Sequence, residues 1–472
     1  MIDPVKRVWI VAGLSVLSLT GCATGGTKQA PETDRLAVVV DTDAGLDDAI
    51  ALMFLASSTD VDLRAVTVSG TGLAHCFPGA RNIVGLLELA GRPEVPVACG
   101  PETPLGKGDV FHPFPDGWRR VADGRYGGVW PIGAGSLDER SAPKLLVDTV
   151  ASSETPVTIV TLGPLTNVAA ALALDDAFAG GVEQVVAMGG AFDVAGNTAN
   201  AEPPPLQNVA EWNLYADPSS AGAVLRAGLP LRFVPLDATN GVPIDAYVLR
   251  AAAFAPATEG IELLRALLAG LRGMITAGDY YLWDPLAAVL TVQPELGTIE
   301  RRTVDVVASG PDAGRTIEAV DPAEGMEAEL FTTADGRSAE VALLTGLAGR
   351  PVPAIAEEPD LVLDPACTTD GVLRAGPGVV QLDADDDARD NRGVAIGTLA
   401  PGRGGADIEA FFAAPTEGPP EWFTLAAVLG AVFDAPTTDL LRLESGTYTI
   451  VCVRGGPRAP ELVGTSTLTV RA

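Results

Sequence analysis

The alternation of apolar runs with helix-like segments is the feature that most restricts how this chain can fold. Between residues 36 and 349, short runs that are apolar on both faces alternate with helical patterns; the runs are LAVVV, LRAVTV, PVTIVTLG, EQVVAMGG and LRFVPLD. Strands buried on both faces and separated by helices are typical of a mostly parallel sheet covered by helices on each side. We therefore predict an open α/β fold whose ligand site lies outside the carboxyl ends of the strands.

Acidic residues gather at that end of the first strand. In VVVDTDAGLDDAIAL (residues 38–52), Asp41, Asp43, Asp47 and Asp48 fall within eight positions. Carboxylates at this density lose hydration and repel one another, so their burial is costly unless a cation lies among them. Three later runs end in TLGPLTN, MGGAF and PLDATN, which a parallel sheet brings to the same edge. The sequence thus predicts a cation site at this edge.

Two other acidic motifs account for this stretch less well. An EF-hand loop needs a glutamate at its twelfth position, and counted from Asp41 that position is Leu52. A phosphatase of the haloacid dehalogenase type also begins with Asp-x-Asp after a strand. That enzyme needs a downstream lysine and a second acidic motif, and lysine is scarce in this chain.

Charge and length restrict the partners and the number of domains. The 472 residues include 61 acidic and 31 basic ones, which gives a formal net charge of −30. This balance argues against nucleic acid as a partner and suits a small neutral ligand or a cation. The length exceeds one ordinary core, so we expect a first domain at residues 36–350 and a small, all-β, sandwich-like domain at residues 351–472. Within the latter, EWFTLAAVLGAVF fits either a helix or paired strands.

The first residues have the pattern of an export signal. A short apolar run follows two basic residues and ends in Leu-Thr-Gly-Cys, which resembles the lipobox of bacterial lipoproteins. We expect residues 1–21 to be a signal peptide, Cys22 to be lipidated and residues 22–35 to form a tether. The protein would then be exported and lipid-anchored to the bacterial cell membrane or envelope surface. Export permits disulfides: Cys367 can pair with Cys452, whereas Cys76 and Cys99 can equally be buried thiols.

Six blocks of sequence resemble the inosine/uridine-preferring nucleoside hydrolase family. DTDAGLDDA is followed, in the family's order, by TLGPLTNVA, VVAMGGAFDVAGN, AEWNLYADPSSA, LDATNGVP and WDPLAA, which together span residues 36–350. The resemblance implies the fold of that family and a calcium-dependent hydrolysis of the N-glycosidic bond of ribonucleosides. It also allows a homo-oligomer, since relatives commonly form homodimers or homotetramers.

The resemblance assigns roles to residues by position. Asp43, Asp48 and Asp284 match the carboxylates that bind Ca²⁺, and Leu162 matches the residue that contributes a backbone carbonyl. Asp43 also matches the general base that accepts a proton from the attacking water. The positions that match the ribose-binding residues are Asp47, Met188, Asn197, Glu211 and Asn213. Asp41 is expected to support the loop.

One departure from the family pattern points to a branch within it. Most members have a histidine, which protonates the leaving base, where this chain has Trp283. The purine-specific inosine–adenosine–guanosine branch also has tryptophan there, and HPFPDGWRR (residues 112–120) resembles the mobile loop of that branch. We therefore expect Trp118 and Trp283 to stack on a purine, because indole faces stabilise a protonated ring. His75 is a candidate proton donor, with a structural role as the alternative, and Trp212 is expected in the core.

Two other functions are compatible with the missing histidine. One is a catalytically weak nucleoside- or sugar-binding surface lipoprotein that keeps the metal site. The other is a hydrolase of another N-riboside, such as a nicotinamide compound, because a stacking pocket accepts that ring as well.

Overall fold

The computed structural model describes residues 35–471 with internal gaps. The segments left out are 202–203, 206, 320–324, 353–360, 364–366, 368–371, 375, 383–391, 414–419, 430–437, 444 and 457–458. The expected signal peptide, Cys22 and the tether up to residue 34 lie outside the described residues. Within the described part, no helix is both long enough and apolar enough to cross a membrane.

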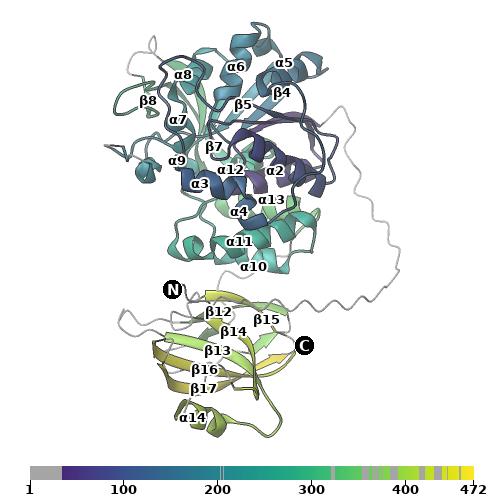
Figure 1. Ribbon diagram of the computed structural model, residues 1–472, viewed down its shortest axis with the longest axis vertical. Helices are drawn as coiled ribbons and strands as arrows, with labels where there is room; N and C mark the ends of the chain where they lie inside the picture. The colour runs from purple at the N-terminus through teal and green to yellow at the C-terminus, as the bar shows by residue number, and fades with distance from the viewer. Residues whose placement is uncertain are drawn as a thin grey trace, which may run out of the picture.

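A large sheet organises the first part of the chain (Figure 1). It has nine strands in the order β3-β2-β1-β4-β5-β6-β9-β7-β8. Its strands are β1 (Leu36–Thr42), β2 (Val61–Val68), β3 (Val97–Cys99), β4 (Val157–Thr161), β5 (Val182–Met188), β6 (Leu231–Val234), β7 (Gly297–Val306), β8 (Thr316–Glu318) and β9 (Met326–Ala334). Neighbours from β3 to β9 pair in parallel, and β7 and β8 are added in antiparallel at one edge. The predicted mostly parallel α/β sheet is confirmed.

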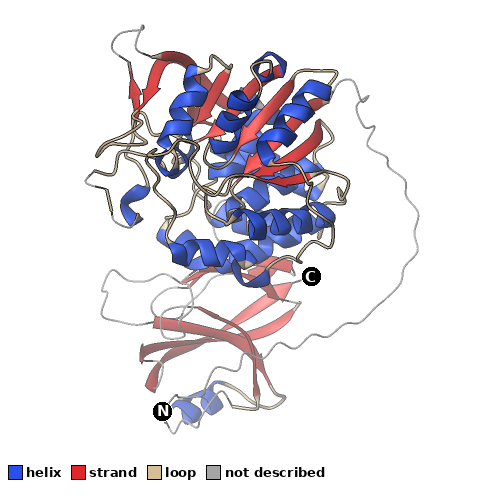
Figure 2. Ribbon diagram, turned by 45° about the horizontal axis from the view of Figure 1, so that its top comes forward, coloured by secondary structure: helices blue, strands red, loops and turns tan. Residues whose placement is uncertain are grey.

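The strands are apolar on both faces because each face has its own core. In β1, Val38 and Val40 enter one core, whereas Ala37 and Val39 enter the other. The first core is covered by α1 (Leu46–Ser57), α2 (Cys76–Leu89), α10 (Ala246–Phe254), α11 (Glu259–Ala277), α12 (Trp283–Val292) and α13 (Gly336–Ala348). The second core is covered by α5 (Ala142–Ser152), α6 (Thr166–Leu174) and α8 (Pro218–Arg226). Figure 2 shows these helices packed along the sheet.

The strand order reverses at β1, which pairs with β2 on one side and with β4 on the other. Ligands of open α/β sheets bind at such a reversal, outside the carboxyl ends of the strands. Asp43 directly follows β1 and Leu162 directly follows β4. Shorter elements complete this edge and its surroundings: α3 (Asp116–Asp123), α4 (Arg125–Gly128), α7 (Trp212–Ala216), α9 (Leu236–Thr239), and the 3₁₀ turns η2 (Phe178–Gly181), η3 (Thr198–Asn200) and η4 (Pro294–Leu296).

The last part of the chain forms two smaller sheets. One contains β10 (Leu361–Leu363), β12 (Gly376–Leu382) and β15 (Thr438–Leu443); the other contains β11 (Val372–Arg374), β17 (Ala459–Arg471), β16 (Gly446–Gly456), β13 (Arg392–Leu399) and β14 (Phe423–Leu429), with α14 (Gly405–Ala413) beside it. Leu363 and Leu443 from the first sheet share a core with Val394 and Ile450 from the second, which is the packing of a sandwich. In EWFTLAAVLGAVF (residues 421–433), Phe423–Leu429 form the strand β14, and residues 430–433 lie outside the described residues.

The four cysteines after residue 35 form two disulfides. Cys367 is bonded to Cys452, as expected, and this bond lies in the core of the β-rich region. Cys76 is bonded to Cys99, which decides between the two alternatives left open for that pair. The second bond joins the first residue of α2 to the last residue of β3, close to the carboxyl edge of the sheet.

Candidate active site

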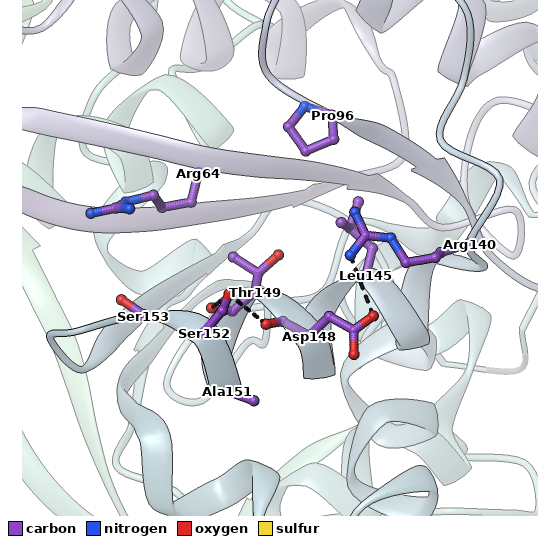
Figure 3. Close-up of a pocket in the computed structure, with 9 residues that line it drawn as sticks. All are labelled: Arg64, Pro96, Arg140, Leu145, Asp148, Thr149, Ala151, Ser152 and Ser153. Atoms are coloured by element: carbon purple, nitrogen blue, oxygen red, sulfur yellow. Dashed lines mark hydrogen bonds and ion pairs between the residues drawn. The ribbon is translucent and has the colours of Figure 1, made fainter.

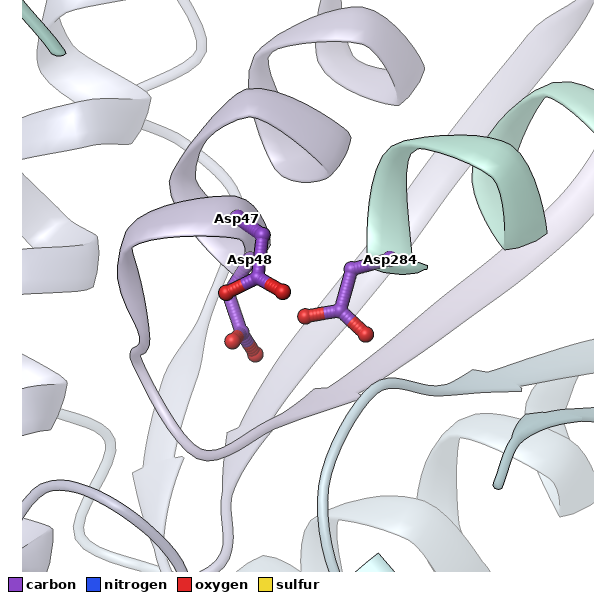
Figure 4. Close-up of side chains that lie close together, drawn as sticks. All are labelled: Asp47, Asp48 and Asp284. Atoms are coloured by element: carbon purple, nitrogen blue, oxygen red, sulfur yellow. The ribbon is translucent and has the colours of Figure 1, made fainter. Parts of the chain in front are cut away.

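Three carboxylates converge at the carboxyl edge of the sheet. Asp47 and Asp48 lie in the first turn of α1, and Asp284 lies in the first turn of α12. One oxygen of each lies within 4.8 Å of the others (Figure 4). Asp48 and Asp284 are buried, and Asp47 is partly buried. We call these three residues the carboxylate cluster.

The turn before α1 explains how Asp48 is held. Ala44 adopts a left-handed conformation with φ 60°, and Gly45 caps the helix. The Asp48 carboxylate accepts hydrogen bonds from the backbone N–H of Gly45 (3.0 Å) and of Asp43 (3.1 Å), and from the Thr42 hydroxyl. A Cβ on Gly45 would lie 2.5 Å from Asp48 Oδ2, so a larger residue here would displace the Asp48 carboxylate. The segment TDAGLDD thus forms a tight cap that fixes one member of the carboxylate cluster.

Asp43 is buried beside the carboxylate cluster but is not one of its three members. Its Oδ2 accepts a hydrogen bond from the Leu73 backbone N–H at 2.9 Å. Two glycines flank it closely: a Cβ on Gly72 would lie 2.2 Å from Asp43 Cβ, and a Cβ on Gly163 would lie 2.7 Å from it. The Asp43 side chain is therefore fixed by its surroundings.

The electrostatics of these carboxylates call for a positive charge. Burial, and then the charge of Asp48, raise the pKa of Asp43 well above its usual range. Burial and the charge of Asp47 do the same to Asp284, and burial and Asp48 raise the pKa of Asp47 to about 7. Within the described part of the chain, none of the ion pairs involves these four residues. Buried hard oxygen donors without a cationic partner fit a divalent cation such as Ca²⁺.

Asp41 has the supporting position that its sequence context predicted. Its Oδ1 accepts hydrogen bonds from the Thr67 hydroxyl at 2.6 Å and from Asn167 Nδ2 at 2.7 Å. These bonds join β1 to β2 and to the start of α6. Asp41 is buried and outside the carboxylate cluster, so it holds the strand ends together.

Four of the five predicted sugar-binding residues, all except Asp47, belong to a hydrogen-bonded group around α7. Asn213 Nδ2 donates to the carbonyl oxygens of Leu162 and Met188, both at 3.1 Å. Glu211 caps α7 by accepting from the N–H of Asn213 (2.9 Å), and it also accepts from the N–H of Gly190 (3.2 Å). Asn197 Oδ1 accepts from the N–H of Trp212 at 3.0 Å. The charge of Glu211 also raises the pKa of Asp47, which links this group to the carboxylate cluster.

The two predicted stacking tryptophans have different surroundings. Trp283 directly precedes Asp284, and its ring contacts those of Tyr280 (5.0 Å between centroids) and Tyr281 (5.7 Å). Its indole N–H is buried without a hydrogen-bond partner among the described residues. Trp118, in α3, is 41% exposed and contacts Trp212 at 5.7 Å. No ring contact between described residues joins the two tryptophans, so their stacking on one base stays a prediction.

Two further aromatic predictions have structural outcomes. Trp212 is 7% exposed and stacks on Phe114 at 4.5 Å, which agrees with its expected place in the core. His75 immediately precedes α2, and its Nδ1 lies 2.8 Å from a carboxylate oxygen of Asp123. This contact is compatible with the structural alternative, and the role of His75 as a proton donor stays a prediction.

Sequence patterns did not indicate two tyrosines near the carboxylate cluster. Burial and the charge of Asp47 raise the pKa of both Tyr126 and Tyr280 well above the usual range. Tyr280 lies three residues before Trp283, and the aromatic residues of YYLW could have indicated that it lies near the site. Tyr126 lies in the turn after α3, in the segment RYGG, whose adjacent glycines are a weaker signal.

A separate hollow of about 570 Å³ lies on the side of β2 and α5 (Figure 3). It is lined by Arg64, Pro96, Arg140, Leu145, Asp148, Thr149, Ala151, Ser152 and Ser153. Its two arginines form ion pairs with neighbouring aspartates. None of the predicted site residues lines it.

Comparison with known proteins identifies the family to which this fold and site belong. Residues 38–347 match the family described as inosine-uridine preferring nucleoside hydrolase. Probable uridine nucleosidase 2 of Arabidopsis thaliana is 31% identical over 293 residues, covering 60% of this chain and 86% of that protein. The pyrimidine-specific ribonucleoside hydrolase RihA of Escherichia coli is 32% identical over 282 residues, covering 58% and 85%. A solved plant nucleoside hydrolase superposes with a TM-score of 0.56 at 30% identity, over 66% of this chain and 99% of that one.

The chain belongs to the inosine-uridine preferring nucleoside hydrolase family, because the match covers more than half of its length. It is a nucleoside N-ribohydrolase, an enzyme that hydrolyses the N-glycosidic bond of ribonucleosides.

Proposed function

We propose that this enzyme is a calcium-dependent hydrolase of purine ribonucleosides that releases free base and ribose. The observation that carries the proposal is the buried carboxylate cluster at the reversal of strand order, with Trp283 directly beside Asp284. The cluster suits a hard cation that binds sugar hydroxyls, and the indole suits the base attached to that sugar.

Asp48 and Asp284 would hold the ion, with Asp43 and the Leu162 carbonyl as the further ligands. The first two are buried in the carboxylate cluster, and Asp43 is linked to Asp48 through its own backbone N–H. The Leu162 carbonyl also accepts from Asn213, so the same amide would position both this ligand and the sugar site. When bound, a divalent ion lowers the pKa of a coordinated water and orients sugar hydroxyls.

Asp43 would accept the proton of the attacking water. One of its oxygens is fixed by the Leu73 N–H, which leaves the other for the proton. Gly72 and Gly163 leave the room that the Asp43 side chain occupies, since a Cβ on either would clash with it. A positioned base of this kind contributes about 10²–10⁴-fold to the rate.

The ribose would lie between the carboxylate cluster and the group around α7. Asp47 is the most exposed member of the cluster, so it is the one placed to contact substrate. Met188, Asn197, Glu211 and Asn213 would complete the sugar site. Hydrogen bonds to the backbone of α7 and of Met188 hold the side chains of Asn197, Glu211 and Asn213 in place before substrate arrives.

The departing base would be stabilised by indole stacking. Breaking the glycosidic bond through an oxocarbenium-like transition state leaves electron density on the base, and protonation of the base relieves it. Trp283 and Trp118 would favour the protonated ring, at about 1–2 kcal/mol for each tryptophan. A purine offers a larger ring system for such stacking than a pyrimidine does.

Pyrimidine ribonucleosides are the second candidate substrates. Two relatives about 30% identical to this chain are named for uridine or pyrimidine nucleosides. Of the two predicted stacking tryptophans, Trp283 directly precedes Asp284, whereas Trp118 contacts Trp212.

One assay separates these candidates. The full chain is incubated with inosine, guanosine, uridine and nicotinamide riboside, and base release is followed with and without a chelator. We expect inosine and guanosine to be cleaved with at least tenfold higher kcat/KM than uridine, and cleavage to stop in chelator and return with Ca²⁺. Cleavage of uridine as fast as inosine would remove the purine preference. Tight binding of nucleoside without any base release would instead support a binding lipoprotein.

The location of the enzyme is a separate proposal. Lipidation of Cys22 would anchor it to the bacterial envelope, and the Leu-Thr-Gly-Cys motif supports this. The control variant Cys22→Ala should move the protein from the membrane fraction to the soluble fraction without changing kcat/KM.

A further inference from the structure

Tyr126 belongs to a strained turn next to the candidate active site. The turn comprises the four residues of α4, and all four have positive φ: 53° for Arg125, 51° for Tyr126, 89° for Gly127 and 86° for Gly128. The left-handed conformation is unfavourable for a residue other than glycine. Two such residues in succession persist only where the surrounding structure fixes them, and such strain concentrates at functional sites.

The turn is fixed from α2. Arg125 Nε donates to the Trp130 carbonyl at 2.7 Å, and the buried Trp130 Nε1 donates to the Asn82 carbonyl at 3.1 Å. The Asn82 side chain in turn donates to the carbonyls of Ala122 (3.1 Å) and Asp123 (3.2 Å), at the end of α3. The backbone before Tyr126 and the Trp130 side chain after it are therefore both bonded to the buried Asn82.

The hydroxyl at the end of this side chain is buried and has spare hydrogen-bonding capacity. It forms no regular hydrogen bond with a described residue. The Leu46 N–H, in the first turn of α1, lies close enough to the phenol oxygen to offset part of the rise that burial causes in the pKa of Tyr126. The next two residues of that turn are Asp47 and Asp48. The phenol stays protonated beside these carboxylates, so it can donate a hydrogen bond. Burial of an unpaired donor is unfavourable, and a bound ligand that accepts its hydrogen bond would remove this penalty.

We propose that the Tyr126 hydroxyl donates a hydrogen bond to a pentose hydroxyl next to Asp47 and so binds the sugar of the nucleoside. A sugar hydroxyl can donate to a carboxylate and accept from a phenol at the same time, so the two side chains are complementary partners for one group. The inference rests on the proposed role of Asp47 in sugar binding. Since the base is not involved, the effect is the same for purine and pyrimidine nucleosides.

The first test compares Tyr126→Phe with the wild-type full chain on inosine and uridine. Phenylalanine keeps the ring and its packing against Trp130 (6.3 Å between centroids) and removes only the hydroxyl. We expect KM to rise and kcat/KM to fall roughly tenfold on both substrates, with kcat changed less than twofold and an unchanged melting temperature. The control Tyr448→Phe, in β16 of the β-rich region, should leave KM, kcat and kcat/KM unchanged on both substrates.

The second test identifies the sugar hydroxyl and excludes a merely structural role. The 2′-, 3′- and 5′-deoxy analogues of inosine are compared with wild type and Tyr126→Phe. The substitution should weaken binding about tenfold for analogues that keep the partner hydroxyl and not at all for the one that lacks it. No loss on the ribonucleosides, or an equal loss on all three analogues, overturns the proposal.

The same variants separate this inference from the proposed function. If inosine is not preferred, uridine still reports on Tyr126. If the wild-type protein cleaves neither nucleoside, the proposed reaction fails, and calorimetric affinities for inosine and its three deoxy analogues decide the role of Tyr126 by the same comparison.

Discussion

The carboxyl edge of the nine-stranded sheet and the β-rich region after residue 361 differ in the kind of side chain that they bury. At the sheet edge, Asp43, Asp48, Glu211 and Asp284 are all buried. Among the described residues after 361, every buried side chain is apolar or a disulfide cysteine. Burial of charge is costly, so a chain keeps it where a ligand or ion uses it. The difference places the chemistry at the sheet edge and gives the β-rich region a purely cohesive core.

Removal of divalent metal should give the largest difference between the two regions. Chelator should abolish base release and lower the melting temperature of the region that contains the carboxylate cluster, because the ion binds only the folded state. Saturation at a hundred times Kd stabilises by about 2.7 kcal/mol. Scanning calorimetry with chelator and after Ca²⁺ addition measures this, and the transition of the β-rich region should not move. Full turnover in chelator would contradict a metal-dependent site.

Asp43→Asn should remove the general base while leaving the fold intact. We expect kcat to fall about 10²–10⁴-fold. Because the amide is neutral, repulsion from Asp48 is relieved, so the free energy of unfolding should not decrease in the metal-free protein. The matched control is Asp407→Asn in α14, which removes a carboxylate paired with Arg403 and should leave kcat unchanged. Steady-state kinetics and urea unfolding of both variants test the contrast, which an active Asp43→Asn enzyme would refute.

The double variant Cys367→Ser/Cys452→Ser should have the reverse pattern. Loss of a native disulfide lowers stability by about 2–5 kcal/mol. The loss should appear in the unfolding of the β-rich region, and kcat/KM for the nucleoside should stay within twofold of wild type. A parallel loss of activity would show that the two regions are coupled, and α10 is the contact through which this would occur, since it lies against β12 and β15.

Trp118→Ala should have the smallest effect on activity, and its effects on inosine and uridine should show whether the enzyme prefers a purine. Loss of one stacking face costs about 1–2 kcal/mol, which lowers kcat/KM for inosine roughly 5–30-fold. Uridine should be affected less, because its ring is smaller. Phe254→Ala is a suitable control, since Phe254 and Trp118 are each 41% exposed. Equal losses on inosine and uridine would argue that Trp118 supports Trp212 and does not contact the base.

Features that depend on local pattern or on strand order could be predicted from the sequence. The two-sided apolar runs specified the sheet because each strand separates two cores, as Val38 and Val39 show. The position of the aspartates after β1 predicted the edge of the sheet where they meet. Asp284 lies at the start of α12, 236 residues after Asp48, and only the family resemblance predicted that it joins them.

Features that depend on long-range contacts could not be predicted. The Asp43 side chain turns to the Leu73 N–H, thirty residues away, so Asp47 and not Asp43 completes the compact set of three carboxylates. Tyr126 reaches the site through a left-handed turn, which has no periodic signature. The bond between Cys76 and Cys99 depends on where α2 starts relative to the end of β3, which spacing along the chain does not reveal.

The Cys76–Cys99 disulfide has a consequence for how the enzyme is produced. The segment from Ser69 to His75 begins at the end of β2 and finishes at this cross-link, and it carries the Leu73 N–H that holds Asp43. Expression in a reducing cytosol would leave one end of that segment untied, although the sheet itself would form unchanged. Batches from reducing and oxidising hosts should therefore have the same circular dichroism spectrum but different specific activity, and mild oxidation of the former should restore it.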